Sequence, residues 1–163
     1  MDKFIGRVWV LGDDIDTDII IPTEYLALKT IDDMKQYGFS PLRPELAGQI
    51  QKGDIIVAGK NFGCGSSREQ APEIIKAMGV QCVIAKSFAR IFFRNSINNG
   101  LLLIEQPDLY DDMKEGDEIT VVMNEHVDYN GKEYPIASLP ENLMDIIRAG
   151  GLVKAMRKLN GLD

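Results

Sequence analysis

Hydrophobic positions fall into short apolar runs separated by longer amphipathic stretches. The apolar runs predict buried strands over four segments, 6–11, 54–58, 80–85 and 101–104. Two amphipathic stretches, one ending at Met78 and one over 87–98, have helical spacing and stop at Gly79 and Gly100. Because strand and helix alternate here, we predict right-handed βαβ units and a sheet that is at least partly parallel.

The remaining segments follow other patterns. Residues 12–18 form a predicted loop with four aspartates, and 25–43 is weakly patterned with a helical turn near 31–37. Two strand-like segments, 118–123 and 132–136, flank Asn130-Gly131, which is typical of a hairpin turn. Further helices are predicted over 140–149 and 152–159.

Length, composition and charge exclude several classes of protein. The chain has 163 residues, and no repeat or change of composition divides it, so we predict one domain over 1–163. The net charge of −7 provides no broad positive field, so nucleic acid is not an expected partner. The apolar runs are far shorter than the ~20 residues that a membrane span needs, and no secretory signal is visible. We therefore expect a cytoplasmic protein that does not bind membranes.

Few side chains suit a metal. The cysteines are Cys64 and Cys82, and the one histidine is His126. This chain therefore cannot supply four thiolates for an iron–sulfur cluster or the usual zinc ligands, and we predict no metal site in it. Cys82 lies in a strand pattern and is expected in the core, and His126 is expected to be exposed without a catalytic role. Cys64 is read as a small packing residue, although its place in a glycine-rich loop also allows a reactive thiol.

The run from Asn61 to Glu69, NFGCGSSRE, is the densest chemical signal. Its glycines permit positive φ and close approach of a ligand to the backbone. Ser66 and Glu69 have the spacing of a capping box, which predicts a helix start there with amides that attract anions. Arg68 adds a planar fork suited to a carboxylate or a phosphate. Pro72 leaves two alternatives, a helix from Ser67 that lacks one bond or a helix that begins near Pro72 after a structured turn.

The run does not match the common nucleotide-binding motifs. A P-loop requires Gly-x-x-x-x-Gly-Lys-Ser/Thr, which is absent, and a dinucleotide-binding fingerprint requires glycine where Arg68 stands. A purely structural helix start with Arg68 on the surface remains open on residues alone.

Three runs together decide between these alternatives: 12–22 (GDDIDTDIIIP), 59–69 (GKNFGCGSSRE) and 85–95 (AKSFARIFFRN). Together they resemble the aconitase superfamily, and most closely the small subunits of split isopropylmalate dehydratases of the short archaeal-like type. The resemblance extends from about residue 6 to residue 152.

The resemblance implies an α/β fold, a three-layer β/β/α swivelling domain of the aconitase C-terminal type. Such a domain closes over a separate large subunit, whose cysteines hold a [4Fe-4S] cluster. By motif match, Ser66 is the catalytic base, and Ser67 and Arg68 bind a carboxylate of a small dicarboxylate substrate. Asp18 matches a further active-site residue of the family.

The implied reaction is a stereospecific dehydration and rehydration that interconverts 2- and 3-isopropylmalate in leucine biosynthesis. In this superfamily the segment after the aspartate motif faces the variable part of the substrate, here Tyr25, Leu26, Ala27 and Leu28. Its apolar character suits an isopropyl group, while Lys29 could meet a carboxylate if turned inward. Methylmalate, dimethylmalate and homoaconitate remain alternatives, because apolar contacts discriminate only modestly. A non-catalytic anion-binding module is the alternative of a different class.

Overall fold

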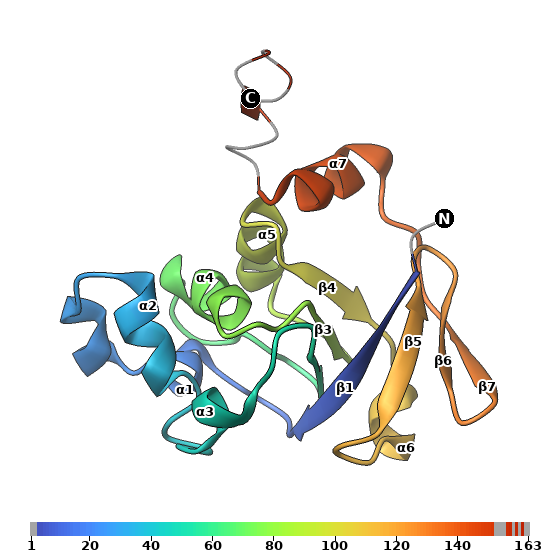
Figure 1. Ribbon diagram of the computed structural model, residues 1–163, viewed down its shortest axis with the longest axis horizontal. Helices are drawn as coiled ribbons and strands as arrows, with labels where there is room; N and C mark the ends of the chain where they lie inside the picture. The colour runs from blue at the N-terminus through green and yellow to red at the C-terminus, as the bar shows by residue number, and fades with distance from the viewer. Residues whose placement is uncertain (1–2, 152–155, 158, 160, 162–163) are drawn as a thin grey trace.

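The computed structural model describes residues 3–151, 156, 157, 159 and 161 (Figure 1). Within these residues, seven strands form one mixed sheet in the order β4-β3-β2-β1-β5-β6-β7. The strands are β1 (Lys3–Leu11), β2 (Ile55–Ala58), β3 (Cys82–Ala85), β4 (Leu102–Glu105), β5 (Glu118–Val122), β6 (His126–Tyr129) and β7 (Lys132–Pro135).

The long strand β1 belongs to both halves of the sheet. Its second half pairs in parallel with β2, from Val8 opposite Ile55 to Leu11 opposite Ala58. Its first half pairs antiparallel with β5. The pairs β2–β3 and β3–β4 are parallel, and β5, β6 and β7 form an antiparallel meander. The predicted partly parallel sheet is therefore confirmed.

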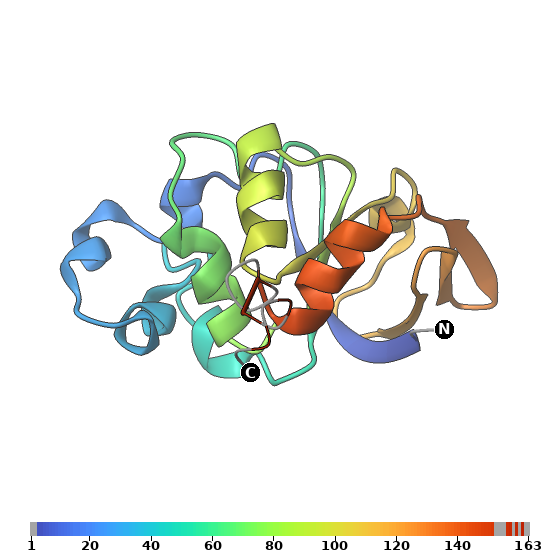
Figure 2. The same cartoon turned by 90° about the horizontal axis from the view of Figure 1, so that it is seen from above.

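Helices cover one face of the parallel strands. In Figures 1 and 2, α4 and α5 lie beside β2–β4, and α1, α2 and α3 lie at the end of the molecule opposite the β6–β7 hairpin. The helices are α1 (Thr17–Ile20), η1 (Thr23–Ala27), α2 (Ile31–Met34), η2 (Lys35–Tyr37), α3 (Leu46–Gln49), α4 (Gln70–Ala77), α5 (Arg90–Asn98), α6 (Leu109–Asp112) and α7 (Glu141–Ala149).

Alternate residues of the parallel strands point into two separate cores. Ile56 and Val83 belong to the core beneath the helices, whereas Ile55 and Ile84 belong to a second core shared with the antiparallel strands. Each strand is thus buried on both faces, which explains its unbroken apolar sequence. Helices, parallel strands and antiparallel strands form three layers, so the expected β/β/α arrangement is confirmed.

Three expectations need correction. The Asn130-Gly131 turn joins β6 to β7 rather than β5 to β7, because the sequence pattern did not reveal the short strand β6. His126 lies on β6 with 21% of its side chain exposed, so it is half-buried and not exposed. α5 begins at Arg90, three residues later than expected.

One of the two predicted C-terminal helices lies within the described residues. α7 ends where Gly150 adopts a left-handed conformation, as predicted. The predicted helix 152–159 falls largely outside the described residues. Among the residues that are described, no helix combines the length and the apolar character that crossing a bilayer requires.

Candidate active site

The loops that follow β1 and β2 are joined by main-chain hydrogen bonds at the carboxyl ends of these strands. The Gly63 amide donates to the Ile15 carbonyl at 2.7 Å, and the Thr17 amide donates to the Cys64 carbonyl at 2.9 Å. The Thr17 hydroxyl adds a 2.7 Å bond to the Ser66 carbonyl. The glycine-rich run is therefore held in one conformation by the loop that carries the aspartates.

The loop that follows β3 extends the parallel pairing beyond the strands. Phe62 donates to the Ser87 carbonyl at 3.1 Å and accepts from the Ala89 amide at 2.9 Å. The Phe62 ring meets the rings of Phe88 and Phe92 edge-on, at centroid distances of 5.9 and 5.5 Å. Residues 87–89 thus pair with the glycine-rich loop, which is why α5 starts only at Arg90.

Gly63 has a steric requirement that its sequence position does not reveal. Its φ is +85°, and a Cβ at this position would overlap the ring of Phe92. Glycine is thus needed both for the backbone conformation and for the approach of α5. This contact fixes the distance between the motif and the first turns of α5.

The predicted capping box is wrong. α4 begins at Gln70, with Glu69 as an N-cap that forms no side-chain capping bond. Pro72 occupies the third helical position, where its missing amide hydrogen needs no intrahelical partner. The alternative of a structured turn followed by a helix near Pro72 is therefore correct. The helix amides begin four residues beyond Ser66.

Both motif serines are exposed. Within the described residues, the Ser66 hydroxyl forms no hydrogen bond, and the carbonyl of Ser66 anchors the residue instead. The Ser67 hydroxyl accepts one long bond of 3.4 Å from the Asn95 amide of α5. Two hydroxyls therefore face solvent on a backbone that is firmly held.

Arg68 is more enclosed than its neighbours, with only 13% of its side chain exposed. Its guanidinium donates to the Ile21 carbonyl at 2.6 Å and to the Thr23 hydroxyl at 2.8 Å. It also forms an ion pair with Asp18, whose own side chain is 66% exposed. A guanidinium has five N–H donors, so donors remain for a further anion. The structure thus brings Asp18 and Arg68 together.

A pocket of about 200 Å³ opens beside these groups. Its lining joins Ser67 and Arg68 to Arg90, Ile91 and Asn95 on the first turns of α5. Ile91 is an exposed large hydrophobic side chain at 60%, so the pocket combines cationic, polar and apolar groups. Such a combination suits a small anion with an apolar substituent.

The segment from Tyr25 to Leu28 does not line this pocket. Tyr25, Leu26 and Leu28 are half-buried and pack against the core beneath the helices, while Ala27 is exposed. The Tyr25 ring stacks on Tyr37 at a centroid distance of 4.0 Å. The lining of the pocket beside the motif comes from α5 instead of from these side chains.

Known proteins match this chain over almost its whole length. A protein named 3-isopropylmalate dehydratase small subunit from Lachnospira eligens is 79% identical over 162 residues and covers 99% of both chains. One from Archaeoglobus fulgidus, named small subunit 1, is 50% identical, covering 95% of this chain and 98% of its own. The chain belongs to the family of 3-isopropylmalate dehydratase small subunits.

Fold and domain comparisons agree with membership of the isopropylmalate dehydratase small subunits. A crystal structure of 3-isopropylmalate dehydratase from Methanocaldococcus jannaschii matches with a TM-score of 0.91 and 39% identity, covering 98% of this chain and 96% of that one. The family model for the aconitase C-terminal domain matches residues 20–109. That range contains Ser66, Ser67 and Arg68 and begins two residues after Asp18.

Sequence reasoning did not assign the pocket residues on α5. Arg90 and Asn95 enter the sequence analysis only as members of the run 85–95, without a role of their own. The available signal was helical spacing, because Ile91 and Asn95 are four residues apart and share one face of a helix. Which loop that face meets depends on the Phe62–Phe88 pairing, a contact between distant parts of the chain.

Cys64 fits the packing interpretation. Burial and the nearby carboxylates of Asp16 and Asp14 raise the pKa of its thiol. A raised pKa disfavours the thiolate, which is the reactive form. The aspartates act as turn and capping residues, since Asp16 caps α1 and Asp13 accepts from the Lys60 amide.

Proposed function

We propose that this chain is the small subunit of a two-chain hydro-lyase that interconverts 2- and 3-isopropylmalate by dehydration and rehydration in leucine biosynthesis. The observation that carries the proposal is the near-complete match to small subunits of this name. The two exposed serines and the enclosed Arg68 at the carboxyl ends of the parallel strands support it. The chain acts in the cytoplasm as one swivelling domain, residues 1–163, that closes over a large subunit.

In this proposal Arg68 and Ser67 bind a carboxylate of the substrate. A guanidinium offers paired donors that match a carboxylate, which a lysine does not. Asp18, the Ile21 carbonyl and the Thr23 hydroxyl hold the guanidinium in place. Because Arg68 is largely enclosed, the substrate carboxylate meets a cation whose direction is already set, and less ordering is needed on binding.

Ser66 is the proposed base. As an alkoxide it takes a proton from the carbon adjacent to the one that carries the leaving hydroxyl group, and as a hydroxyl it returns a proton to the alkene during rehydration. Its exposure lets a substrate on a second chain reach it. Since α4 starts four residues later, the alkoxide depends on nearby loop amides, on Arg68 and on groups of the large subunit for its stabilisation.

This chain does not fit a cluster of its own. Cys64 lies in the loop after β2, and Cys82 is the fully buried first residue of β3. The proposed [4Fe-4S] cluster therefore belongs to the large subunit, where it supplies a Lewis acid for the substrate hydroxyl. The residues of this chain contribute the base and a carboxylate site.

The apolar substituent of the substrate has two candidate contacts. Tyr25, Leu26, Ala27 and Leu28 keep the proposed role of facing it, supported by their apolar character. Ile91 is a second exposed apolar group and lies in the pocket beside Arg68. Lys29, which directly follows Leu28, is exposed.

Reconstitution tests the proposal. The chain is mixed with a cluster-loaded large subunit, and alkene formation is followed with 2-isopropylmalate, methylmalate, dimethylmalate and the hydroxy-tricarboxylate whose dehydration gives homoaconitate. We expect turnover only with both chains present and the highest kcat/KM with isopropylmalate. A preference for another substrate would revise the substrate, whereas no turnover with any of them would favour the non-catalytic anion-binding module.

A further inference from the structure

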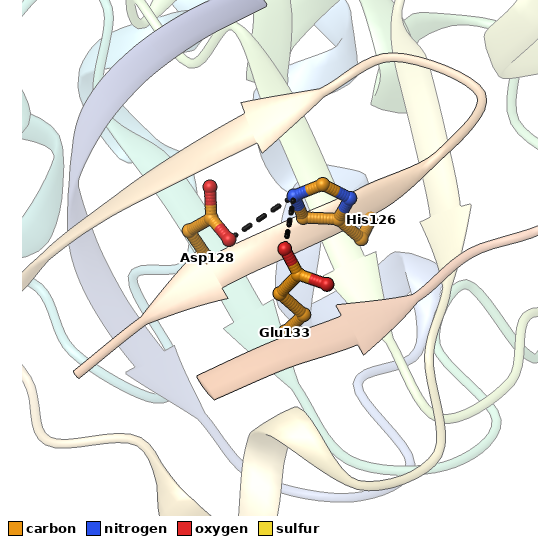
Figure 3. Close-up of side chains that lie close together, drawn as sticks. All are labelled: His126, Asp128 and Glu133. Carbon is orange, nitrogen blue, oxygen red and sulfur yellow. Dashed lines mark ion pairs between the residues drawn. The ribbon is translucent and has the colours of Figure 1, made fainter. Parts of the chain in front are cut away.

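Three potential ligand side chains converge on the outer face of the β6–β7 hairpin, away from the proposed active site. His126 and Asp128 are two residues apart on β6, so they point to the same face. Glu133 lies directly across from Asp128 on β7. Figure 3 shows the two carboxylates pointing toward one edge of the imidazole ring. The strand register, and not a flexible loop, sets this arrangement.

The charges of the cluster are unbalanced. His126 Nε2 lies 3.1 Å from Asp128 Oδ1 and 3.5 Å from Glu133 Oε2. Among the described residues, no lysine or arginine forms an ion pair with either carboxylate. Lys132 is the nearest basic residue along β7, but it pairs with Asp112. Two carboxylates thus share one imidazole, and a cation between them would reduce their repulsion.

The spacing matches that of ligands around a small ion. Zinc binds nitrogen and oxygen at about 2.0–2.2 Å in tetrahedral geometry, which places neighbouring ligand atoms roughly 3.3–3.5 Å apart. The distances from His126 Nε2 to the two carboxylate oxygens, 3.1 and 3.5 Å, are close to that value, and the three ligand atoms all lie within 4.8 Å of one another. Glu133 is 71% exposed, so its side chain can rotate to complete the site.

We propose that His126, Asp128 and Glu133 bind one divalent transition-metal ion, with Zn²⁺ as the best fit. A donor set of one imidazole and two carboxylates suits Zn²⁺ better than Ca²⁺ or Mg²⁺, which prefer oxygen ligands alone. Three protein ligands leave a coordination position for water. The ion joins β6 to the edge strand β7 and stabilises the hairpin.

The single histidine allows a direct test. Because the chain has only one histidine, its ring signals in an NMR spectrum report on His126 alone, provided that the protein carries no histidine tag. Zn²⁺ added to the metal-free full-length chain is expected to shift these signals and to saturate at one equivalent. Calorimetry is expected to give a micromolar dissociation constant, and thermal denaturation a higher Tm with Zn²⁺.

Variants separate this site from adventitious binding. His126→Gln, Asp128→Asn and Glu133→Gln should each weaken binding by about tenfold or more, because each removes one of three ligands. Glu118→Gln on the neighbouring strand β5 removes an exposed carboxylate outside the cluster and should leave the affinity unchanged. Cys64→Ser should also leave it unchanged, which excludes zinc bound by that thiol.

Two outcomes would overturn the proposal. One is an absence of any shift of the His126 ring signals with excess Zn²⁺. The other is a dissociation constant that stays the same in the cluster variants or changes equally in Glu118→Gln. The cluster variants expose no new apolar surface, and far-UV circular dichroism checks that each remains folded. None of these measurements depends on the large subunit or on turnover.

Discussion

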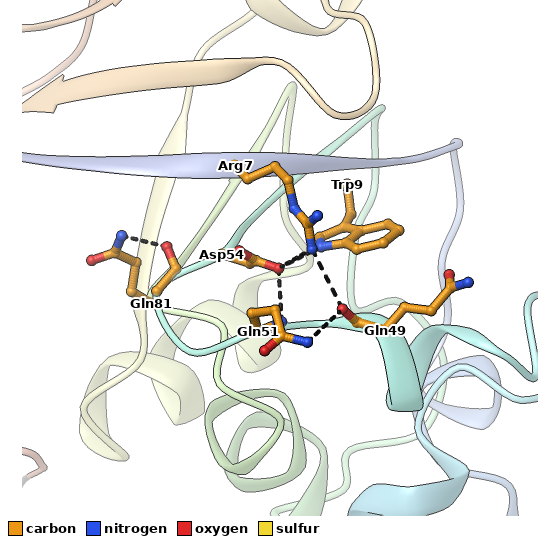
Figure 4. Close-up of polar contacts among 7 residues, drawn as sticks. Arg7, Trp9, Gln49, Gln51, Asp54 and Gln81 are labelled. Carbon is orange, nitrogen blue, oxygen red and sulfur yellow. Dashed lines mark hydrogen bonds and ion pairs between the residues drawn. The ribbon is translucent and has the colours of Figure 1, made fainter.

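Polar side chains at the amino and carboxyl ends of the parallel strands differ in how they are hydrogen-bonded. At the amino end, the buried carboxylate of Asp54 accepts hydrogen bonds from Trp9 Nε1 and the Gln51 amide, both at 2.8 Å, and from Arg7 at 3.2 Å (Figure 4). Gln81 bridges the neighbouring strands through the carbonyls of Gly53 and Ile5. Polar groups here are satisfied within the chain and hold the strands together.

At the carboxyl end, main-chain bonds hold the loops, but the hydroxyls of the two motif serines are not enclosed by the chain. Main-chain bonds fix the loops after β1, β2 and β3, while the hydroxyls of Ser66 and Ser67 face solvent. The side chain of Arg68 is largely enclosed and is held by Asp18 and two oxygen acceptors, which leaves N–H donors free. Ligands in open parallel sheets bind at this end of the strands. We therefore expect the amino end to contribute mainly to stability and the carboxyl end to contact the ligand.

The largest expected effect concerns activity at the carboxyl end. Ser66→Ala should lower kcat in the reconstituted complex by about 10²–10⁴-fold, the range that a positioned base contributes. The free energy of unfolding should change by less than about 0.5 kcal/mol, because the side chain is exposed. Steady-state kinetics and urea denaturation measure the two quantities. Full activity in this variant would show that the base lies elsewhere, and Ser138→Ala, at an exposed serine that does not line the pocket, serves as the matched control.

The next effect concerns stability at the amino end. Asp54→Ala leaves the Trp9 indole N–H and the Gln51 amide without their acceptor. An unsatisfied donor costs about 1–3 kcal/mol when it is buried, as at Trp9, and less when it is part-buried, as at Gln51, so we expect a loss of about 3 kcal/mol in urea denaturation. The kcat of the folded complex should remain that of the native chain. A large fall in kcat without a loss of stability would contradict the division between the two ends.

Two glycines with positive φ, one at each end of β2, allow the same substitution to be compared at the two ends. Gly63→Ala at the carboxyl end adds a Cβ against the Phe92 ring, whereas the nearest atom to a Cβ at Gly53 lies 3.8 Å away. We expect a loss of about 2–3 kcal/mol for Gly63→Ala, from steric overlap and backbone strain together. Gly53→Ala should lose about 1 kcal/mol from the strain alone.

Thermal or urea unfolding of both glycine variants gives the result. Equal losses would mean that the Phe92 contact relaxes without cost. In that case the motif and α5 would not be held at a fixed distance, and the pocket between them would lose its structural basis.

The sequence predicted the parts of the fold that depend on local pattern. The parallel strands are apolar throughout because two cores cover them, and Gly79, Gly100 and Gly150 end their helices as expected. The strand β6 was missed because it has only four residues, too few for their polar–apolar alternation to stand out, and because its stability comes from pairing with distant strands. Local propensity does not include that pairing.

The site was predicted by residue type and only partly by geometry. Asp18 and Arg68 were both named, but their ion pair depends on the loop interlock that the sequence does not show. The capping box failed because the Ser66 carbonyl is bonded to Thr17 and the chain turns before α4 begins. The packing of Tyr25 on Tyr37 is likewise a contact between segments without a local signal.

The smallest expected effect concerns the labelling rates of the two cysteines, which lie at opposite ends of the parallel strands. Cys82 is fully buried at the amino end of β3, and Cys64 is partly exposed in the carboxyl-end loop. Burial and neighbouring carboxylates raise the pKa of the Cys64 thiol, so at neutral pH its thiolate fraction is below that of an ordinary cysteine. Iodoacetamide should therefore label Cys64 more slowly than a free thiol, with a rate that rises about tenfold per pH unit below the pKa.

Cys82 should react only when the chain unfolds, because its burial both removes access and raises its pKa. Mass spectrometry of labelled peptides over a pH series distinguishes the two sites. In a Cys64→Ser chain, the remaining labelling is that of Cys82 alone. Binding of the large subunit should slow the labelling of Cys64 and leave that of Cys82 unchanged, because ligand contact is confined to the carboxyl end. Equal protection of both cysteines would instead mean that the partner stabilises the whole sheet, and the two ends would then not be functionally separate.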